Sequence, residues 1–177
     1  HCIICVGKNE MNILDLKGLE NVPFLHQHNS YFGDVVPESL AIIGASKENL
    51  ELAEIYTNLG TKVVIFEQEA PEKILPQQDT TAINYLLQNL LRKGIEFYFN
   101  LSIREIKQLE DGQIQIEDDE ENKYIYSHLY SPVIEQYSDN LGLDKIGIKF
   151  SDKGIYCTST GQTTLKNIWA FGAASNC

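Results

Sequence analysis

The chain has 177 residues, a formal net charge of −11 at pH 7 and an isoelectric point near 4.7. This acidic balance argues against nucleic acid and anionic membrane surfaces as partners, because Lys and Arg side chains are needed to bind phosphate groups. No apolar run approaches the roughly 18 residues of a membrane-spanning helix, and no signal peptide precedes the chain, so a cytoplasmic location is expected.

The first predicted element is an apolar strand from Cys2 to Val6, which ends at Gly7. Cys2 and Cys5 have the C-x-x-C spacing of some redox pairs. Residues three apart on a strand point to opposite faces, however, so we expect two ordinary strand cysteines of the kind that are often buried.

The remaining cysteines and the histidines give no metal or redox motif. Cys157 and Cys177 have no partner at a motif spacing. His26 and His28 would share one face of a strand, but without a nearby third ligand they are better explained as part of a surface loop. We therefore expect no metal site.

The most informative stretch follows, from Ser39 to Glu67. An apolar strand reaches Ile43, a turn at Gly44 leads into an amphipathic helix, and a second β-branched strand ends at Glu67. This order is typical of a βαβ nucleotide-binding unit. An acid roughly 20 residues past the first Gly can accept hydrogen bonds from an adenosine ribose, so the sequence predicts NAD binding with Glu67 at the ribose.

The turn departs from the usual Gly-rich fingerprint, since it offers Gly44, Ser46 and Asn49 where Gly is expected. Ser46 is expected to crowd the pyrophosphate and Asn49 to crowd the contact between helix and strand. Glu48 places a negative charge where a phosphate would bind, and Ser46 can cap the helix itself. Replacing Ser46 and Asn49 by Gly is expected to tighten NADH binding if the site survives. The alternative is a self-capped helix in a nucleotide fold that no longer binds nucleotide.

A second helix is predicted from Asp79 to Lys93 and a strand from Ile95 to Phe99. Three further β-rich runs follow, around residues 102–109, 113–117 and 123–130, with a turn signal at Asp111-Gly112. They predict an antiparallel meander laid on a parallel sheet, hence an α/β fold. The acidic run at 117–122 is interpreted as a solvated hairpin tip.

From Leu40 to Glu67 the sequence resembles the NAD(P)H-binding domain of the FAD-dependent pyridine nucleotide–disulfide oxidoreductases, the family of dihydrolipoamide dehydrogenase, glutathione reductase and mercuric reductase. Further segments resemble this family in the same order along the chain, at residues 74–79, 94–97, 141–148 and 164–172. The resemblance implies a Rossmann-like FAD/NAD(P)-binding fold, with a parallel sheet and helices plus the three-stranded meander.

The resemblance also implies a domain organisation. Residues 1–36 would be the end of the first FAD-domain segment and a linker, residues 37–140 the NAD(P)-binding domain, and residues 141–177 the start of the second FAD-domain segment. The FAD fingerprint and the redox-active cysteine pair are absent from this sequence, so we expect a fragment without catalytic residues. Its partners would be the rest of the FAD domain and the interface domain of a homodimeric parent.

Residue by residue, the resemblance places Gly44, Ala45 and Ser46 at the nucleotide, and Glu51 where a helix Glu faces the nicotinamide. Gly7 and Gly172 would end FAD-domain strands, as further cofactor-binding positions.

Two departures bear on cofactor binding. Val133 stands in the segment where the family has a Gly followed by Arg, close to the nucleotide. Ala173 replaces the Asp that holds the ribityl–phosphate arm of the flavin. FAD is therefore expected only in the parent protein, and NAD binding is expected to be intact, weak or lost.

Two functions remain open at this point. The first is an NAD(H)-binding domain that passes hydride from NADH to flavin in a divergent, dihydrolipoamide dehydrogenase-like parent enzyme. The alternative is a degenerate pseudoenzyme domain, kept as a scaffold or protein-interaction module with little or no nucleotide binding.

Overall fold

The computed structural model describes residues 1–8, 10–27, 29–30, 35–137 and 139–177, and His28 lies outside them. The chain forms two compact units, which are described separately. The smaller unit combines His1–Asn12 with Val133–Cys177, and the larger unit is Ile13–Pro132. The sequence placed boundaries after residues 36 and 140, whereas the units divide after residues 12 and 132. Residues 13–24 belong to the larger unit because Leu19 and Val22 are buried in its core.

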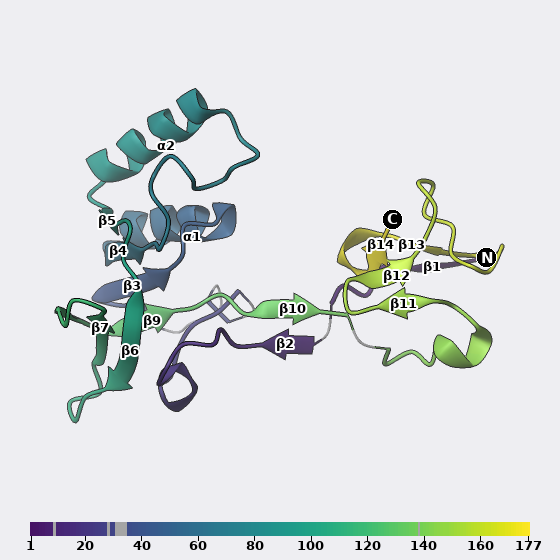
Figure 1. The fold of residues 1–177 in the computed structure, drawn as a ribbon, viewed down its shortest axis with the longest axis horizontal. Helices are drawn as coiled ribbons and strands as arrows, with labels where there is room; N and C mark the ends of the chain where they lie inside the picture. Colours follow the sequence, from purple (N-terminus) through teal and green to yellow (C-terminus); the bar gives the residue numbers. More distant parts are fainter. Residues whose placement is uncertain (9, 28, 31–34, 138) are drawn as a thin grey trace. The chain divides into compact units, whose positions relative to one another are not determined.

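A four-stranded parallel sheet forms the centre of the larger unit, in the order β5-β4-β3-β9 (Figure 1). The strands are β3 (Ser39–Ile43), β4 (Lys62–Phe66), β5 (Glu96–Tyr98) and β9 (His128–Tyr130). Strands β3 and β4 are apolar almost throughout because both of their faces are covered. The parallel sheet predicted from the sequence is confirmed.

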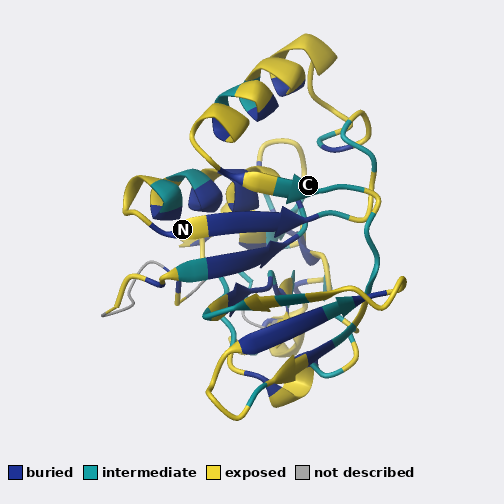
Figure 2. Ribbon diagram, turned by 90° about the vertical axis from the view of Figure 1, so that its left-hand side faces the viewer, coloured by how far each residue is buried: buried dark blue, intermediate teal, exposed yellow. Residues whose placement is uncertain are grey.

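Two helices cover one face of this sheet: α1 (Lys47–Asn58) and α2 (Thr80–Arg92). Leu40 and Ile42 of β3 pack in one core with residues of both helices, whereas Ala41 and Ile43 pack in a second core on the opposite face. This alternation is the period of two of a strand. Figure 2 shows the central strands largely buried and the outer sides of both helices exposed.

The opposite face of the sheet is covered by the predicted meander of β6 (Ile103–Gln108), β7 (Ile114–Asp118) and β8 (Lys123–Tyr126), in which both pairings are antiparallel. The 3-10 helix η1 (Leu19–Asn21) packs into the same core. Gly18, with φ +88°, precedes η1, and a Cβ at this position would lie 1.9 Å from the carbonyl oxygen of Ile106. Only Gly permits this close approach to β6.

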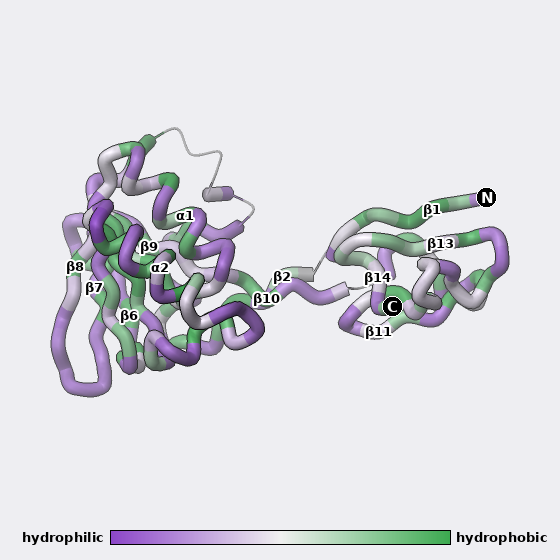
Figure 3. The backbone as a smooth tube through the Cα atoms, turned by 90° about the horizontal axis from the view of Figure 1, so that it is seen from above, coloured by the Kyte–Doolittle hydropathy of each residue, from purple (hydrophilic) through white to green (hydrophobic). Residues whose placement is uncertain are grey.

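The described residues of the smaller unit form three short sheets. Strands β1 (Cys2–Ile4) and β13 (Ile168–Ala170) pair in parallel and carry hydrophobic stretches in Figure 3. The antiparallel pair is β2 (Glu10–Asn12) and β10 (Ile134–Gln136), and the third sheet is β11 (Phe150–Ser151), β12 (Gly154–Tyr156) and β14 (Ser175–Asn176). The short helices η2 (Asp144–Ile146) and η3 (Gly172–Ala174) complete the unit.

The cysteines differ from what their spacing suggests. Cys157 and Cys177, which have no partner at a motif spacing, form a disulfide with each other. Strands β12 and β14 pair in parallel, which brings the residues that follow them together across 20 positions of sequence. Cys2 and Cys5 are free thiols and both are exposed, so the burial that is common for strand cysteines is not found here.

Neither metal nor membrane features appear in the part of the chain that the structure describes. It holds no group of three or more His, Cys, Asp or Glu side chains that could ligate a metal ion. Among the same residues, no helix has the length and apolar character needed to cross a membrane.

Candidate nucleotide site

The turn between β3 and α1 lies at the carboxyl edge of the parallel sheet. Gly44 adopts φ +85°, which is strained for residues with a side chain, and its N–H donates to the Phe66 carbonyl at 2.8 Å. From β3 the chain continues to β4 and β5 on one side of the sheet, whereas β9 pairs with the other edge of β3. The strand order therefore changes direction at β3. Open parallel sheets bind their ligands at such points, beyond the carboxyl ends of the strands.

Glu67 follows β4 directly and its carboxylate lies against this turn. One oxygen, Oε2, accepts a hydrogen bond from the Ala45 N–H at 2.6 Å, and Oε1 accepts one from the Glu69 N–H at 2.8 Å. The side chain is half-buried. The structure therefore brings together Gly44, Ala45, Ser46 and Glu67, as the sequence predicts.

A cavity of about 200 Å³ adjoins the Glu67 carboxylate. Gly44 and Phe66 line it from the sheet, Leu16 from the segment before η1, and Leu101 and Ser102 from the β5–β6 connection. The lining thus combines apolar side chains with the Glu67 carboxylate and the polar side chains of Gln68 and Ser102. This combination suits a flat, partly apolar group with hydroxyls at one end.

The first turn of α1 offers three backbone donors. The Ser46 hydroxyl caps the helix by accepting a hydrogen bond from the Asn49 N–H at 3.2 Å. Among the described residues, none accepts a hydrogen bond from the backbone N–H of Ser46, Lys47 or Glu48. All three residues are exposed. Donors of this kind at the N-terminus of a helix attract anions, although the Glu48 carboxylate opposes the same attraction.

Asn49 does not crowd the contact between helix and strand, so this sequence-based expectation is wrong. Its side chain is 1% exposed, and its Nδ2 donates to the carbonyl oxygens of Ile43 and Gly44, each at 2.9 Å. Helix α1 still begins at Lys47. The amide fits because it satisfies two carbonyls at the end of β3.

The other predicted cofactor positions are on α1 or in the smaller unit. Glu51 is exposed on α1. Gly7 and Gly172 belong to the smaller unit, have φ of +71° and +68°, and border open space. Ala173, which follows Gly172, is exposed and supplies no carboxylate.

Val133 begins the second segment of the smaller unit and is buried. It therefore offers no polar side chain to a ligand. The neighbouring Ser131, in the larger unit, is fully buried, and its N–H donates to the Leu25 carbonyl at 2.9 Å.

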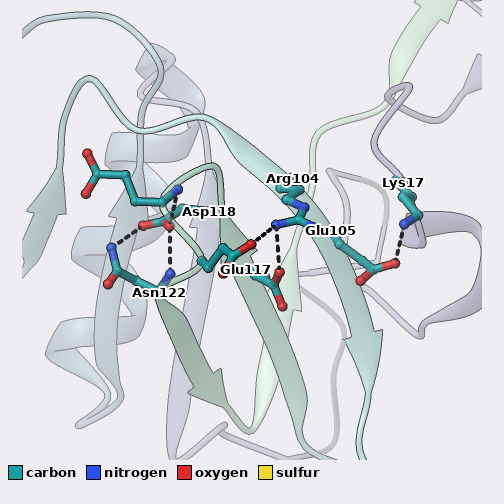
Figure 4. Close-up of polar contacts among 8 residues, drawn as sticks. Lys17, Arg104, Glu105, Glu117, Asp118 and Asn122 are labelled. Carbon is teal, nitrogen blue, oxygen red and sulfur yellow. Dashed lines mark hydrogen bonds and ion pairs between the residues drawn. The ribbon is translucent and has the colours of Figure 1, made fainter.

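Residues 119–122 of the acidic hairpin tip are exposed, as expected from the sequence, and the tip is organised by one buried carboxylate, that of Asp118. Asp118 is 4% exposed and accepts hydrogen bonds from the backbone N–H and the side chain of Asn122 (Figure 4). It also accepts hydrogen bonds from the Glu120 N–H and the Tyr124 hydroxyl, and all four distances are 2.9 to 3.0 Å. Burial alone would raise the pKa of Asp118, but these hydrogen bonds hold it below its ordinary value.

Three tyrosines that the sequence analysis missed surround the residue before Glu67. Phe66 stacks on Tyr98 and meets Tyr124 and Tyr126 edge-on, with ring centroids 5.1 to 6.0 Å apart. Burial and the Asp118 carboxylate raise the pKa of Tyr124 to about 12. These rings pack on the last residue of β4 and thereby help to position the backbone of Glu67. In the sequence, the alternating aromatic residues of the last predicted strand, Tyr124 and Tyr126, could have indicated this cluster.

The larger unit has an α/β fold of the class that dinucleotide-binding domains use, and the chain adds a second unit of short strands. A family model described as "Pyridine nucleotide-disulphide oxidoreductase" matches residues 1–176, and the chain belongs to this family. Proteins of this family depend on FAD and NAD(P), so membership supports flavin and nicotinamide nucleotides as cofactors in general terms.

Similar proteins agree with this assignment. The dihydrolipoyl dehydrogenase of Bacillus subtilis is 27% identical over 97% of this chain and 37% of its own length. That of Geobacillus stearothermophilus is 32% identical over 77% of this chain and 30% of its own length. The chain thus spans about a third of the length of these relatives. The Escherichia coli flavoprotein disulfide reductase RclA shares the fold, with a TM-score of 0.83 at 22% identity over 97% of this chain and 39% of its own.

Proposed function

We propose that the larger unit binds NAD(H) at the β3–α1 turn, and that a complete enzyme containing this chain passes hydride from NADH to flavin. The observation that carries the proposal is the hydrogen bond from the Ala45 N–H to Glu67 Oε2, because it holds the carboxylate beside the turn. Membership of the family supplies the reaction class. The nicotinamide and flavin rings carry the hydride chemistry, and this chain supplies binding and orientation.

Each part of the site has a role in this proposal. The N–H groups of residues 46–48 bind the pyrophosphate, and Glu67 accepts hydrogen bonds from the ribose hydroxyls. A carboxylate oxygen has two lone pairs, so Glu67 can retain Ala45 and Glu69 as donors while it binds ribose. Its negative charge repels a 2′-phosphate, which favours NAD(H) over NADP(H).

The remaining assignments follow from the family. Glu51 would face the nicotinamide, and Gly7 and Gly172 would lie in the flavin-binding region of the complete protein. The methyl side chain of Ala173 offers no hydrogen bond to flavin phosphate or ribityl groups. We place the complete enzyme in the cytoplasm as a homodimer.

Calorimetric titration with NADH and NADPH tests the proposal. We expect NADPH to bind the unaltered protein at least about tenfold more weakly than NADH, which corresponds to about 1.4 kcal/mol. Glu67→Gln keeps the size of the side chain and removes its charge, so the preference for NADH over NADPH should largely disappear. Glu72→Gln is the matched control, since Glu72 is an exposed acid on the loop that follows β4. Equal or tighter binding of NADPH to the unaltered protein would reject the proposal.

A degenerate scaffold domain is the second candidate. Both Glu67 oxygens already accept backbone hydrogen bonds, and Glu48 adds a negative charge at the helix N-terminus. Both features favour a turn that is complete without nucleotide. If neither nucleotide binds at millimolar concentration, the scaffold is the function that remains.

A further inference from the structure

Asn49 joins three parts of the turn. Its Nδ2 donates hydrogen bonds to the carbonyl of Ile43, the last residue of β3, and to the carbonyl of Gly44. Its backbone N–H donates to the capping hydroxyl of Ser46. One buried residue of α1 therefore holds the end of the strand, the left-handed Gly and the helix cap in one arrangement.

The burial of Asn49 makes these bonds costly to lose. Its side chain is 1% exposed, so an amide without partners here would keep its full desolvation cost. The same bonds satisfy two carbonyls next to Gly44, a residue whose backbone is otherwise freer than any other. A Cβ built on Gly44 would lie 3.6 Å from Asn49 Nδ2, which shows how closely the amide covers the turn.

We propose that Asn49 is a positioning residue for the dinucleotide. Its side-chain amide fixes the β3–α1 turn so that the N–H groups of residues 46–48 are already directed toward the pyrophosphate before the ligand arrives. The inference rests on the proposed function, because it concerns the pyrophosphate part of that site. Ordering the turn in advance lowers the entropic cost of binding.

This role reverses an expectation from the sequence. The sequence predicts that Gly at both Ser46 and Asn49 tightens NADH binding, because two crowding side chains are removed. In the structure, the replacement at Asn49 removes two hydrogen bonds and places a flexible residue in the first turn of α1. Asn49→Gly is therefore expected to weaken binding.

The test uses ADP-ribose and adenosine, because ADP-ribose carries the pyrophosphate and its terminal ribose, whereas adenosine has neither. We expect Asn49→Ala and Asn49→Asp to lower the affinity for ADP-ribose by about tenfold or more, with adenosine affinity within about twofold, because adenosine meets Glu67 and not the helix N-terminus. Asn58→Ala, an exposed Asn on the same helix, is the control and should change neither affinity.

Amide hydrogen exchange provides a readout that needs no ligand. In Asn49→Ala, the amides of Gly44 and Leu50, which donate to the carbonyls of Phe66 and Ser46, should exchange at least about tenfold faster than in the unaltered protein, while amides in the middle of α1 should be unchanged. This pattern separates local loosening of the turn from general unfolding of the domain.

The outcomes distinguish the two proposals. An equal loss of affinity for both ligands, or an unchanged affinity for ADP-ribose, overturns the positioning role while the proposed function stands. If the unaltered protein binds neither ligand, the proposed function fails and the role fails with it. Faster exchange would then show Asn49 to be purely structural.

Discussion

Replacement of the buried carboxylate at the hairpin tip, Asp118→Asn, should destabilise the larger unit. The carboxylate accepts four hydrogen bonds, two of them on Oδ2 from the Asn122 side chain and the Tyr124 hydroxyl. An amide NH₂ at Oδ2 would face the Asn122 donor. Hydrogen bonds to charged groups contribute about 1.5–3 kcal/mol each, and water can replace part of this at an exposed turn, so we expect a net loss of about 2 kcal/mol.

The same carboxylate predicts a pH dependence. The pKa of Asp118 is lower in the folded protein than its ordinary value, because its hydrogen bonds to Asn122, Tyr124 and Glu120 outweigh burial. Its contribution to stability is therefore present above the unfolded pKa, near 3.8, and is lost as the pH falls through the lower folded pKa. Asp118→Asn should remove this part of the acid destabilisation.

Urea unfolding followed by far-ultraviolet circular dichroism, from about pH 6 to about pH 2, measures both effects. Asp119→Asn is the matched control, because Asp119 is the exposed neighbour on the same turn. If the two variants unfold at the same urea concentration, or if Asp118→Asn retains the acid slope of the unaltered protein, the account of this hairpin is wrong.

Two further predictions concern stability. Reduction of the Cys157–Cys177 disulfide should lower the unfolding free energy of the smaller unit by about 3 kcal/mol, because it releases a loop of 20 residues. Fluorescence of the single tryptophan measures this unfolding, and an unchanged unfolding midpoint after reduction would contradict the prediction. Gly18→Ala should destabilise the larger unit by more than about 2 kcal/mol, because its Cβ would overlap the Ile106 carbonyl. Gly60→Ala has a similar positive φ but open space around it, so equal thermal shifts for the two variants would refute the steric argument.

The sequence predicts the βαβ unit because its information is local. Strand β3 is continuously apolar, Gly44 marks the turn, and Glu67 lies at a fixed spacing beyond it. Periodicity and turn residues also give the meander. These signals need no knowledge of which distant residues meet, so the positions of Gly44 and Glu67 follow directly.

What the sequence does not predict depends on three-dimensional contacts. Asn49 looks too large for a position that usually holds a small residue, until the carbonyls of Ile43 and Gly44 are seen within its reach. The acidic run conceals one buried member, Asp118, whose partners come from the turn and the next strand.

The burial of Leu19 and the disulfide both depend on contacts between distant parts of the chain. Apart from Val22, the buried residues that share a core with Leu19 come from the parallel sheet and the meander. The disulfide forms because two short strands pair across 20 residues, a distance that no cysteine motif encodes.

The most direct test of the central claim is an amide chemical-shift map of the labelled protein titrated with NADH. The account predicts that the largest shifts fall on the amides of Ala45, Ser46, Lys47 and Glu67, with little change at the hairpin tip around Asp118. Shifts that leave the β3–α1 turn untouched, or no shifts at millimolar NADH, would contradict it.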